Sequence, residues 1–96
     1  MKLAIIGSRS FVDYNRLCRE LAPYKPKISE IISGGAKGAD TLGERYALEN
    51  GFKTQIFYII INCDGVIAFW DMVSPGTKHS ISLCDKYNKP YKIISI

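Results

Sequence analysis

Short runs that contain apolar residues recur along the chain, and turn-forming residues separate them. Each run holds five or six residues, the length of an ordinary β-strand. The runs at 3–6 and 66–70 are continuously apolar, which is typical of strands buried on both faces of a parallel sheet. The pattern therefore predicts strands over 2–6, 28–33, 52–57, 66–70 and 91–96.

Amphipathic segments lie between these runs and predict helices. Asp13 is a candidate N-cap for the first helix, and prolines follow its expected end. A second helix is expected to open at Asp40 or Thr41 and to stop at the Asn50-Gly51 signal. We expect the three helices over 14–22, 41–50 and 79–87.

Strands and helices alternate along the chain, which predicts an α/β fold. The expected architecture is a parallel sheet of about five strands with helices on both faces. With 96 residues, the chain suits a single small domain spanning 1–96. An apolar fraction of 47% is enough for a core, and the charged fraction of 23% is ordinary for a globular protein.

The joint between the third and fourth strands is too short for this fold. A parallel crossover needs about a dozen residues, but only 58–65 separate Phe57 from Val66. In a doubly wound sheet this joint must also pass the first strand to reach the far side. Because 58–63 is too apolar for an exposed link, we interpret the joint as lacking residues, by deletion or because a loop between Phe57 and Asn62 is missing. A change of topology is the alternative.

Composition excludes several classes of protein. The apolar start at 3–6 is too short for a signal peptide, and no apolar run is long enough to span a membrane. Cys18, Cys63 and Cys84 form no C-x-x-C pair and His79 is the only histidine, which argues against disulfides and a zinc site. We expect a cytoplasmic protein with reduced thiols and no bound metal. A net charge of +4 suits an anionic ligand and allows contact with nucleic acid.

The most informative segment is 33–40, which reads S-G-G-A-K-G-A-D between an expected strand and an expected helix. Glycines let the backbone approach an anion, and a helix N-terminus offers it unpaired N–H groups and positive partial charge. Lys37 adds a cation. The alternative is a tight turn without a ligand, because one glycine-rich turn is a weak signal.

Two further turns, at 7–10 and 71–77, also follow strands. The carboxyl ends of parallel strands share one edge, where ligands bind. Together the three turns suit a phosphate or pyrophosphate with a ribose. The candidate ligand-binding residues are Gly7, Ser8, Arg9, Ser33, Gly34, Gly35, Ala36, Lys37, Gly38, Asp40, Asp71, Ser74, Gly76 and Thr77.

Several of these residues also have structural explanations. We interpret Asp40 as an N-cap or turn brace rather than a catalytic acid, and 74–77 as a turn that also caps the next helix. Asp71 suits a ribose hydroxyl or base and equally a solvated sheet edge. Trp70 is expected to pack in the core rather than stack on a base, and His79 to lie on the surface. No dinucleotide G-x-G-x-x-G, P-loop or G-x-S-x-G motif is present.

Four motifs spread over nearly the whole chain resemble the YspA/cpYpsA-related branch of the SLOG superfamily. They are I-G-S-R-S-F at 6–11, I-S-G-G-A-K-G-A-D at 32–40, A-F-W-D at 68–71 and S-P-G-T at 74–77. The resemblance implies a Rossmann-like fold and a nucleotide-type ligand, with links to bacterial or phage conflict systems. The chain is also similar to the DNA-processing protein of natural transformation and to LOG-type nucleoside-5′-monophosphate phosphoribohydrolases.

Two departures from these relatives limit what the resemblance implies. The segment with an Arg-Asn pair that this branch carries before 62–64 is absent, at the same joint that is too short. The phosphoribohydrolases have a catalytic Glu in G-G-x-G-T-x-x-E, and Ser80 stands at that position here. The acid–base carboxylate for glycosidic cleavage is therefore missing, although Glu44 or Asp71 could substitute for it.

We expect a domain that senses or sequesters a nucleotide-type ligand such as NAD, ADP-ribose or a mononucleotide. In this hypothesis Gly34, Gly35, Lys37 and Gly38 hold phosphate, with further anion contacts from the turns at 8–9 and 74–77. An enzyme that cleaves a nucleotide glycosidic bond is the first alternative, and a single-stranded nucleic-acid binder is the second. Self-association is expected because so small a sheet buries little apolar area.

Overall fold

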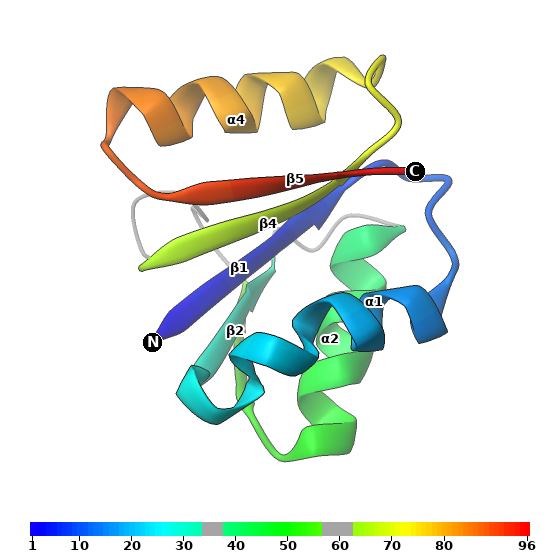
Figure 1. Ribbon diagram of the computed structural model, residues 1–96, viewed down its shortest axis with the longest axis vertical. Helices are drawn as coiled ribbons and strands as arrows, with labels where there is room; N and C mark the ends of the chain where they lie inside the picture. Colours follow the sequence, from blue (N-terminus) through cyan, green and yellow to red (C-terminus); the bar gives the residue numbers. More distant parts are fainter. Residues whose placement is uncertain (34–37, 57–62) are drawn as a thin grey trace.

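The computed structural model describes residues 1–33, 38–56 and 63–96. Within these residues, five parallel strands form one sheet in the order β3-β2-β1-β4-β5 (Figure 1). This arrangement confirms the expected parallel α/β architecture. The strands are β1 Lys2–Gly7, β2 Glu30–Ser33, β3 Lys53–Ile56, β4 Gly65–Trp70 and β5 Tyr91–Ser95.

Helices cover both faces of the sheet, as the sequence predicts. In Figure 1, α4 lies on one face, and α1 and α2 lie on the other. The helices are α1 Tyr14–Leu21, the 3₁₀ helix η1 Ala22–Lys27, α2 Ala39–Asn50 and α4 Pro75–Lys86. Among the described residues, no helix has the length and apolarity needed to cross a membrane.

The alternation of side chains along the strands divides the core into two clusters. In β1, Leu3 and Ile5 pack with residues of α1 and α2, whereas Ala4 and Ile6 pack on the side of α4. All four side chains are buried. Both faces of β1 are therefore covered, which explains why its sequence is apolar throughout.

Local signals place the helix ends, with one clear difference from the expectation. Asp13 caps α1 by accepting a hydrogen bond from the Arg16 N–H at 3.1 Å, and Gly51 ends α2 in the left-handed conformation. The third helix was expected from His79, but α4 already begins at Pro75. Proline at the first helical position has a suitable φ and needs no N–H partner, so it starts this helix rather than prolonging the turn.

The strand order confirms the crossing expected at the short joint. β3 lies at one edge of the sheet and β4 lies beyond β1, so the chain passes β2 and β1 between them. Residues 57–62 of this joint lie outside the described residues. The interpretation that the joint lacks residues therefore stays a prediction.

Candidate functional site

The β1–α1 turn, residues 7–11, is fixed to the end of β4. The Ser8 N–H donates to the Phe69 carbonyl at 2.9 Å, and the Ser8 carbonyl accepts from the Phe11 N–H at 3.1 Å. The Phe11 ring stacks on the Phe69 ring, with centroids 4.6 Å apart. Backbone bonds and aromatic packing therefore hold this turn in one position at the carboxyl edge of the sheet.

The start of α2 packs directly against this turn, because two glycines permit the close approach. At Gly38, φ is +81°, and an added Cβ would lie 2.3 Å from the Ser8 carbonyl oxygen. At Gly7, a Cβ would lie 2.7 Å from the Ala39 Cβ and 2.3 Å from the Phe69 carbonyl oxygen. Both predicted ligand-binding glycines thus have a structural role in bringing the turns together.

The N-cap of α2 is Gly38, so Asp40 lies in the first turn of the helix and the expectation that it is the N-cap is wrong. Gly38 can adopt the φ that this entry into α2 requires, and an aspartate can do so only with strain. Of the other predicted residues in this turn, Ser33 is fully buried at the end of β2. Gly34, Gly35, Ala36 and Lys37 lie outside the described residues.

A hydrogen-bond network around Asp71 fixes the loop between β4 and α4. One carboxylate oxygen, Oδ1, accepts from the N–H groups of Val73 at 3.0 Å and Ser74 at 2.8 Å. The other, Oδ2, accepts from the Ser74 hydroxyl at 2.8 Å. The network reaches the first turn, because Ser8 Oγ accepts from the Asp71 N–H at 3.0 Å and lies 3.2 Å from Ser74 Oγ. Asp71 therefore joins the two turns instead of standing as a solvated edge residue.

This environment lowers the pKa of the Asp71 carboxyl from 3.8 to about 2, chiefly through the backbone N–H groups of Val73 and Ser74 and then through the hydroxyls of Ser74 and Ser8. A carboxylate that remains charged down to this pH and already accepts three hydrogen bonds is a poor proton donor at neutral pH. The geometry favours a bracing role for Asp71 over a role as general acid.

Asp71→Asn should change how stability depends on pH. A folded-state pKa below the ordinary value means that Asp71 stabilises the fold above about pH 4 and that this contribution is lost as the pH falls through about 2. We expect the difference in unfolding free energy between the wild type and Asp71→Asn to shrink as the pH falls from 5 to 2, measured by urea denaturation. A difference that stays constant over this range would contradict the bracing role.

The amino-terminal turn of α4 has no side-chain cap. Ser74 occupies the N-cap position, but its hydroxyl bonds to Asp71 rather than to a helix N–H. Pro75 follows at the first helical position and has no N–H, so the first N–H groups of this turn belong to Gly76 and Thr77. Helix termini of this kind attract anions.

Two side-chain features keep this helix end open. An added Cβ at Gly76 would meet no atom within 4 Å. Thr77 is only 7% exposed, and its hydroxyl makes no hydrogen bond within the described part of the chain. Among the described residues, every fully enclosed side-chain oxygen has a hydrogen-bond partner. Because the Thr77 hydroxyl has no partner, it is not fully enclosed and reaches the open space in front of α4.

The β1–α1 turn and the start of α4 face each other across a cleft of about 550 Å³. This volume lies within the range of small-molecule sites. Arg9 is the cation in its described wall, and no acidic residue lines that wall. We call this space the cleft; its described lining residues are Ile6, Gly7, Ser8, Arg9, Ser10, Ser74, Pro75, Gly76, Thr77 and Ser80.

The cleft unites six of the predicted residues and adds others. Gly7, Ser8 and Arg9 line one side, and Ser74, Gly76 and Thr77 line the other. The predicted residues Asp71 and Ser33 do not line the cleft. Ser80 was not among the predicted ligand-binding residues, although it stands four positions after Gly76, on the same side of the helix. Its hydroxyl donates to the Gly76 carbonyl at 3.2 Å.

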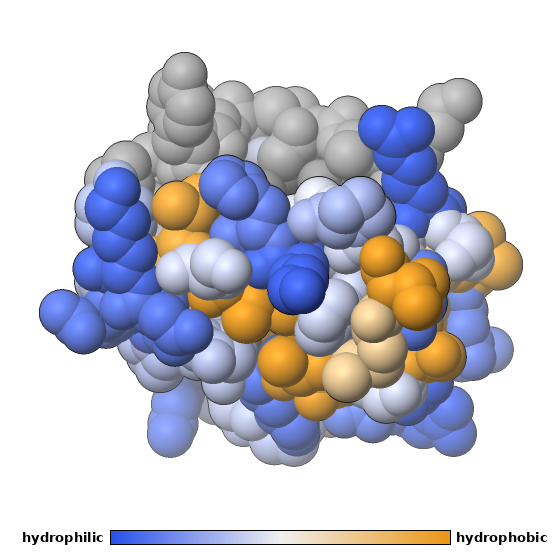
Figure 2. Space-filling model, turned by 90° about the horizontal axis from the view of Figure 1, so that it is seen from above, coloured by the Kyte–Doolittle hydropathy of each residue, from blue (hydrophilic) through white to orange (hydrophobic). Residues whose placement is uncertain are grey.

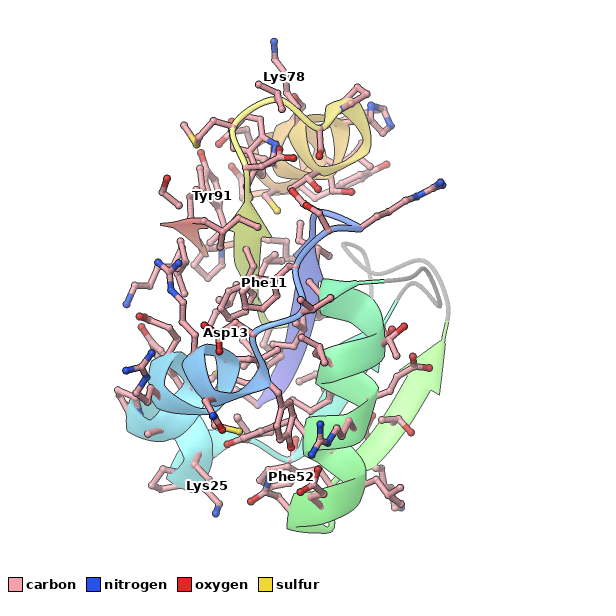
Figure 3. The ribbon with its side chains drawn as sticks, turned by 90° about the vertical axis from the view of Figure 1, so that its right-hand side faces the viewer. Phe11, Asp13, Lys25, Phe52, Lys78 and Tyr91 are labelled. Atoms are coloured by element: carbon pink, nitrogen blue, oxygen red, sulfur yellow. The ribbon has the colours of Figure 1, made fainter. Side chains whose placement is uncertain are left out.

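The structure confirms the expectations for Trp70, which packs against the core, and for His79, which lies on the surface. The Trp70 indole packs against the cluster on the α4 side, and its N–H donates to the Ser74 carbonyl at 3.1 Å. His79 is exposed on the surface. Lys78 extends into solvent from α4, at the opposite end of the molecule from Lys25 (Figure 3).

Comparison with known proteins identifies one family. The model of the YAcAr family, described as "YspA, cpYpsA-related SLOG family", matches residues 1–58. This range includes the turns at 7–11 and 33–40 and ends before β4. No curated protein and no solved structure matches the chain.

Proposed function

Because the chain belongs to the YspA, cpYpsA-related SLOG family, we propose that it binds a nucleotide-type ligand in the cleft and holds it without turnover. Family membership supports a nucleotide-related function in general. The class of ligand we propose is a nucleoside phosphate, such as NAD, ADP-ribose or a mononucleotide. Its phosphate lies at the amino-terminal turn of α4.

The observation that carries this proposal is the open start of α4. The Gly76 and Thr77 N–H groups have no side-chain cap, and the nearby Thr77 hydroxyl is 7% exposed and unbonded within the described residues. The Thr77 hydroxyl reaches the open space in front of α4, where it could donate a hydrogen bond to a phosphate oxygen. The absence of a side chain at Gly76 leaves the room that an anion needs.

Arg9 and the glycine turn add to the same proposal. Arg9 is exposed in the wall of the cleft and makes no ion pair with a described residue, so it is available to a second charged group. The start of α2 packs against Ser8 and Arg9, which brings Gly38 to the same edge. We propose that Gly34, Gly35 and Lys37 hold the remaining phosphate oxygens.

Ser80 supports binding rather than catalysis. It stands where the phosphoribohydrolases carry their catalytic glutamate, and it lines the cleft. Its hydroxyl is bonded to the Gly76 carbonyl, and a hydroxyl cannot protonate a departing base as a carboxylic acid does. We therefore expect no free base when the protein is incubated with nucleoside monophosphates, with release of base measured by chromatography. Base release at a rate that depends on the protein would contradict this part of the proposal.

Titration with NAD, ADP-ribose and AMP tests the proposal directly. Trp70 is the only tryptophan of the chain, and its indole bonds to Ser74 beside the cleft, so its fluorescence reports occupancy. We expect saturable binding of at least one of these ligands and none of adenosine, which lacks the phosphate. The double variant Gly35→Val with Lys37→Ala should bind at least about tenfold more weakly, since charged hydrogen bonds contribute about 1.5–3 kcal/mol each. Equal binding by this variant, or no binding by the wild type, would overturn the proposal.

A further inference from the structure

The N-cap position of α4 holds a serine that does not cap the helix. The backbone of Ser74 is extended, with φ −63° and ψ 117°, and Pro75 follows it at the first helical position. Serine is among the preferred N-cap residues, because its oxygen can accept from the N–H groups two or three positions later. Those groups belong to Gly76 and Thr77, and neither bonds to the Ser74 side chain. A good capping residue therefore stands unused at the start of α4.

Asp71 holds the Ser74 side chain in another direction. The Ser74 hydroxyl donates to Asp71 Oδ2 at 2.8 Å, and Ser8 Oγ lies 3.2 Å from Ser74 Oγ. The N–H groups of Val73 and Ser74 lower the pKa of the Asp71 carboxyl to about 2, so this group is a charged acceptor at neutral pH. A hydrogen bond to a charged group is roughly twice as strong as one between neutral groups. The bond to Asp71 therefore wins over a neutral cap bond.

The choice between these two bonds rests on the rotation of one side chain. The Ser74 backbone is fixed, because its N–H donates to Asp71 Oδ1 at 2.8 Å and its carbonyl accepts from the Lys78 N–H at 3.2 Å and the Trp70 indole N–H at 3.1 Å. A serine oxygen occupies one of a few staggered positions about χ1. In the position that reaches Asp71, the oxygen makes no bond to the helix.

The first turn of α4 is consequently open to solvent and to the cleft. The helix forms the surface that faces the viewer in Figure 2, where hydrophilic residues lie beside hydrophobic ones. Thr77 is only 7% exposed, yet its hydroxyl lacks a partner among the described residues and borders the cleft. The space in front of Gly76 is empty of protein atoms within 4 Å of an added Cβ. These donors are available to an anion only while Ser74 is held away from them.

We propose that Asp71 is a positioning residue for the phosphate site: by holding the Ser74 hydroxyl, it prevents the chain from capping α4 itself and leaves the Thr77 N–H to the ligand. Asp71 does not line the cleft, so it acts through Ser74. Without the carboxylate, the Ser74 oxygen turns to the helix, accepts from the Thr77 N–H and competes with the phosphate. This inference rests on the proposed function, which places a nucleotide phosphate at this helix start.

Exchange of amide hydrogens with water, followed by NMR in the absence of ligand, tests the change of partner. We expect the Thr77 N–H to exchange at least about fivefold more slowly in Asp71→Ala than in the wild type, and fast again in Asp71→Ala with Ser74→Ala. Asp71→Asn keeps both a donor and an acceptor for Ser74, so its Thr77 N–H should exchange as in the wild type. Equal rates in the wild type and a folded Asp71→Ala would overturn the inference.

Asp13→Ala calibrates this measurement within the same protein. Asp13 caps α1 by accepting from the Arg16 N–H at 3.1 Å, so its removal should speed exchange at Arg16. The size of that change gives the protection that one cap bond provides.

Titration calorimetry with NAD, ADP-ribose and AMP tests the effect on binding. Loss of the Asp71 charge by itself favours an anion, so Ser74→Ala is compared in two backgrounds that isolate the cap. We expect Ser74→Ala to strengthen binding about fivefold more in Asp71→Ala than in the wild type, the effect of removing one cap bond. Ser82→Ala, at an exposed serine of the same helix, should have the same effect in both backgrounds. An equal effect of Ser74→Ala in both would contradict the positioning role.

Ser74→Asn repeats the test without loosening the loop. Asparagine caps helices as well as serine does, and its amide can donate to Asp71 while its oxygen accepts from Thr77. We expect slow Thr77 exchange and at least about tenfold weaker binding of these nucleotides. Slow exchange with undiminished binding would overturn the inference. If the wild type binds none of the three nucleotides, the proposed function fails, and the exchange rates still decide whether Asp71 keeps Ser74 from capping α4.

Discussion

Gly38→Ala should lower the free energy of unfolding by about 4 kcal/mol, the largest effect on stability that we expect from a single added methyl group. The backbone at Gly38 has φ +81° and ψ −126°, a region that costs other residues about 1–3 kcal/mol. The new Cβ would also lie 2.3 Å from the Ser8 carbonyl oxygen and 2.6 Å from the Arg9 Cα. Both neighbours are backbone atoms, so the turns must separate, which adds about 1–3 kcal/mol.

Gly51→Ala is the control that isolates the contribution of the backbone conformation. Gly51 also has a positive φ, +73°, but an added Cβ there meets no atom within 4 Å. This variant should lose only about 1 kcal/mol. Urea denaturation of both variants measures the two values. Equal losses would mean that the turns do not pack as closely as the Gly38 geometry requires.

Gly76→Val should weaken nucleotide binding about 100-fold and leave stability nearly unchanged. A Cβ in a helix points toward the amino terminus, so the valine side chain would extend toward the space that we assign to the phosphate. Displacing the phosphate from the N–H groups of Gly76 and Thr77 removes charged hydrogen bonds of about 1.5–3 kcal/mol each. Because a Cβ at this position meets no protein atom within 4 Å, the fold itself should accommodate the change.

Ser82→Val is the matched control for this effect. Ser82 is exposed in the same helix, and its hydroxyl donates to the Lys78 carbonyl at 3.1 Å. Both variants place the same β-branched side chain in α4, but Ser82 does not line the cleft. Titration of both variants, followed by Trp70 fluorescence, distinguishes a loss of the phosphate site from a general effect of valine on the helix. If Gly76→Val bound the nucleotide as tightly as Ser82→Val, the phosphate would not lie at α4.

The local sequence was sufficient for most of the secondary structure. The continuous apolar runs at 3–6 and 66–70 predict buried parallel strands, because both faces of such strands need apolar cover. All five predicted strands correspond to observed ones. Asp13 and Gly51 mark helix ends through contacts within a few residues. The start of α4 was missed by four positions, because Pro75 suits a turn and a first helical turn equally well.

The candidate site was predicted less completely, because contacts between distant residues define it. The glycines at 7 and 38 match a phosphate-binding pattern, yet each is also required by a backbone that approaches from another turn. From the sequence, Asp71 is expected to bind a ligand or to be solvated. In the structure it belongs to a hydrogen-bond network that includes Ser8, more than sixty positions away, and this network gives it a bracing role. No spacing rule within the chain signals such a contact.

By itself, the sequence determined the order of strands and helices and placed three polar turns at the carboxyl edge of a parallel sheet, because periodicity and turn chemistry are local properties. Only the tertiary structure decided how those turns divide their roles. Packing between 7–11 and the start of α2 uses two glycines, and the Asp71 network occupies the Ser74 hydroxyl. The first turn of α4 is therefore left without a cap, and its N–H groups and the Thr77 hydroxyl face the cleft.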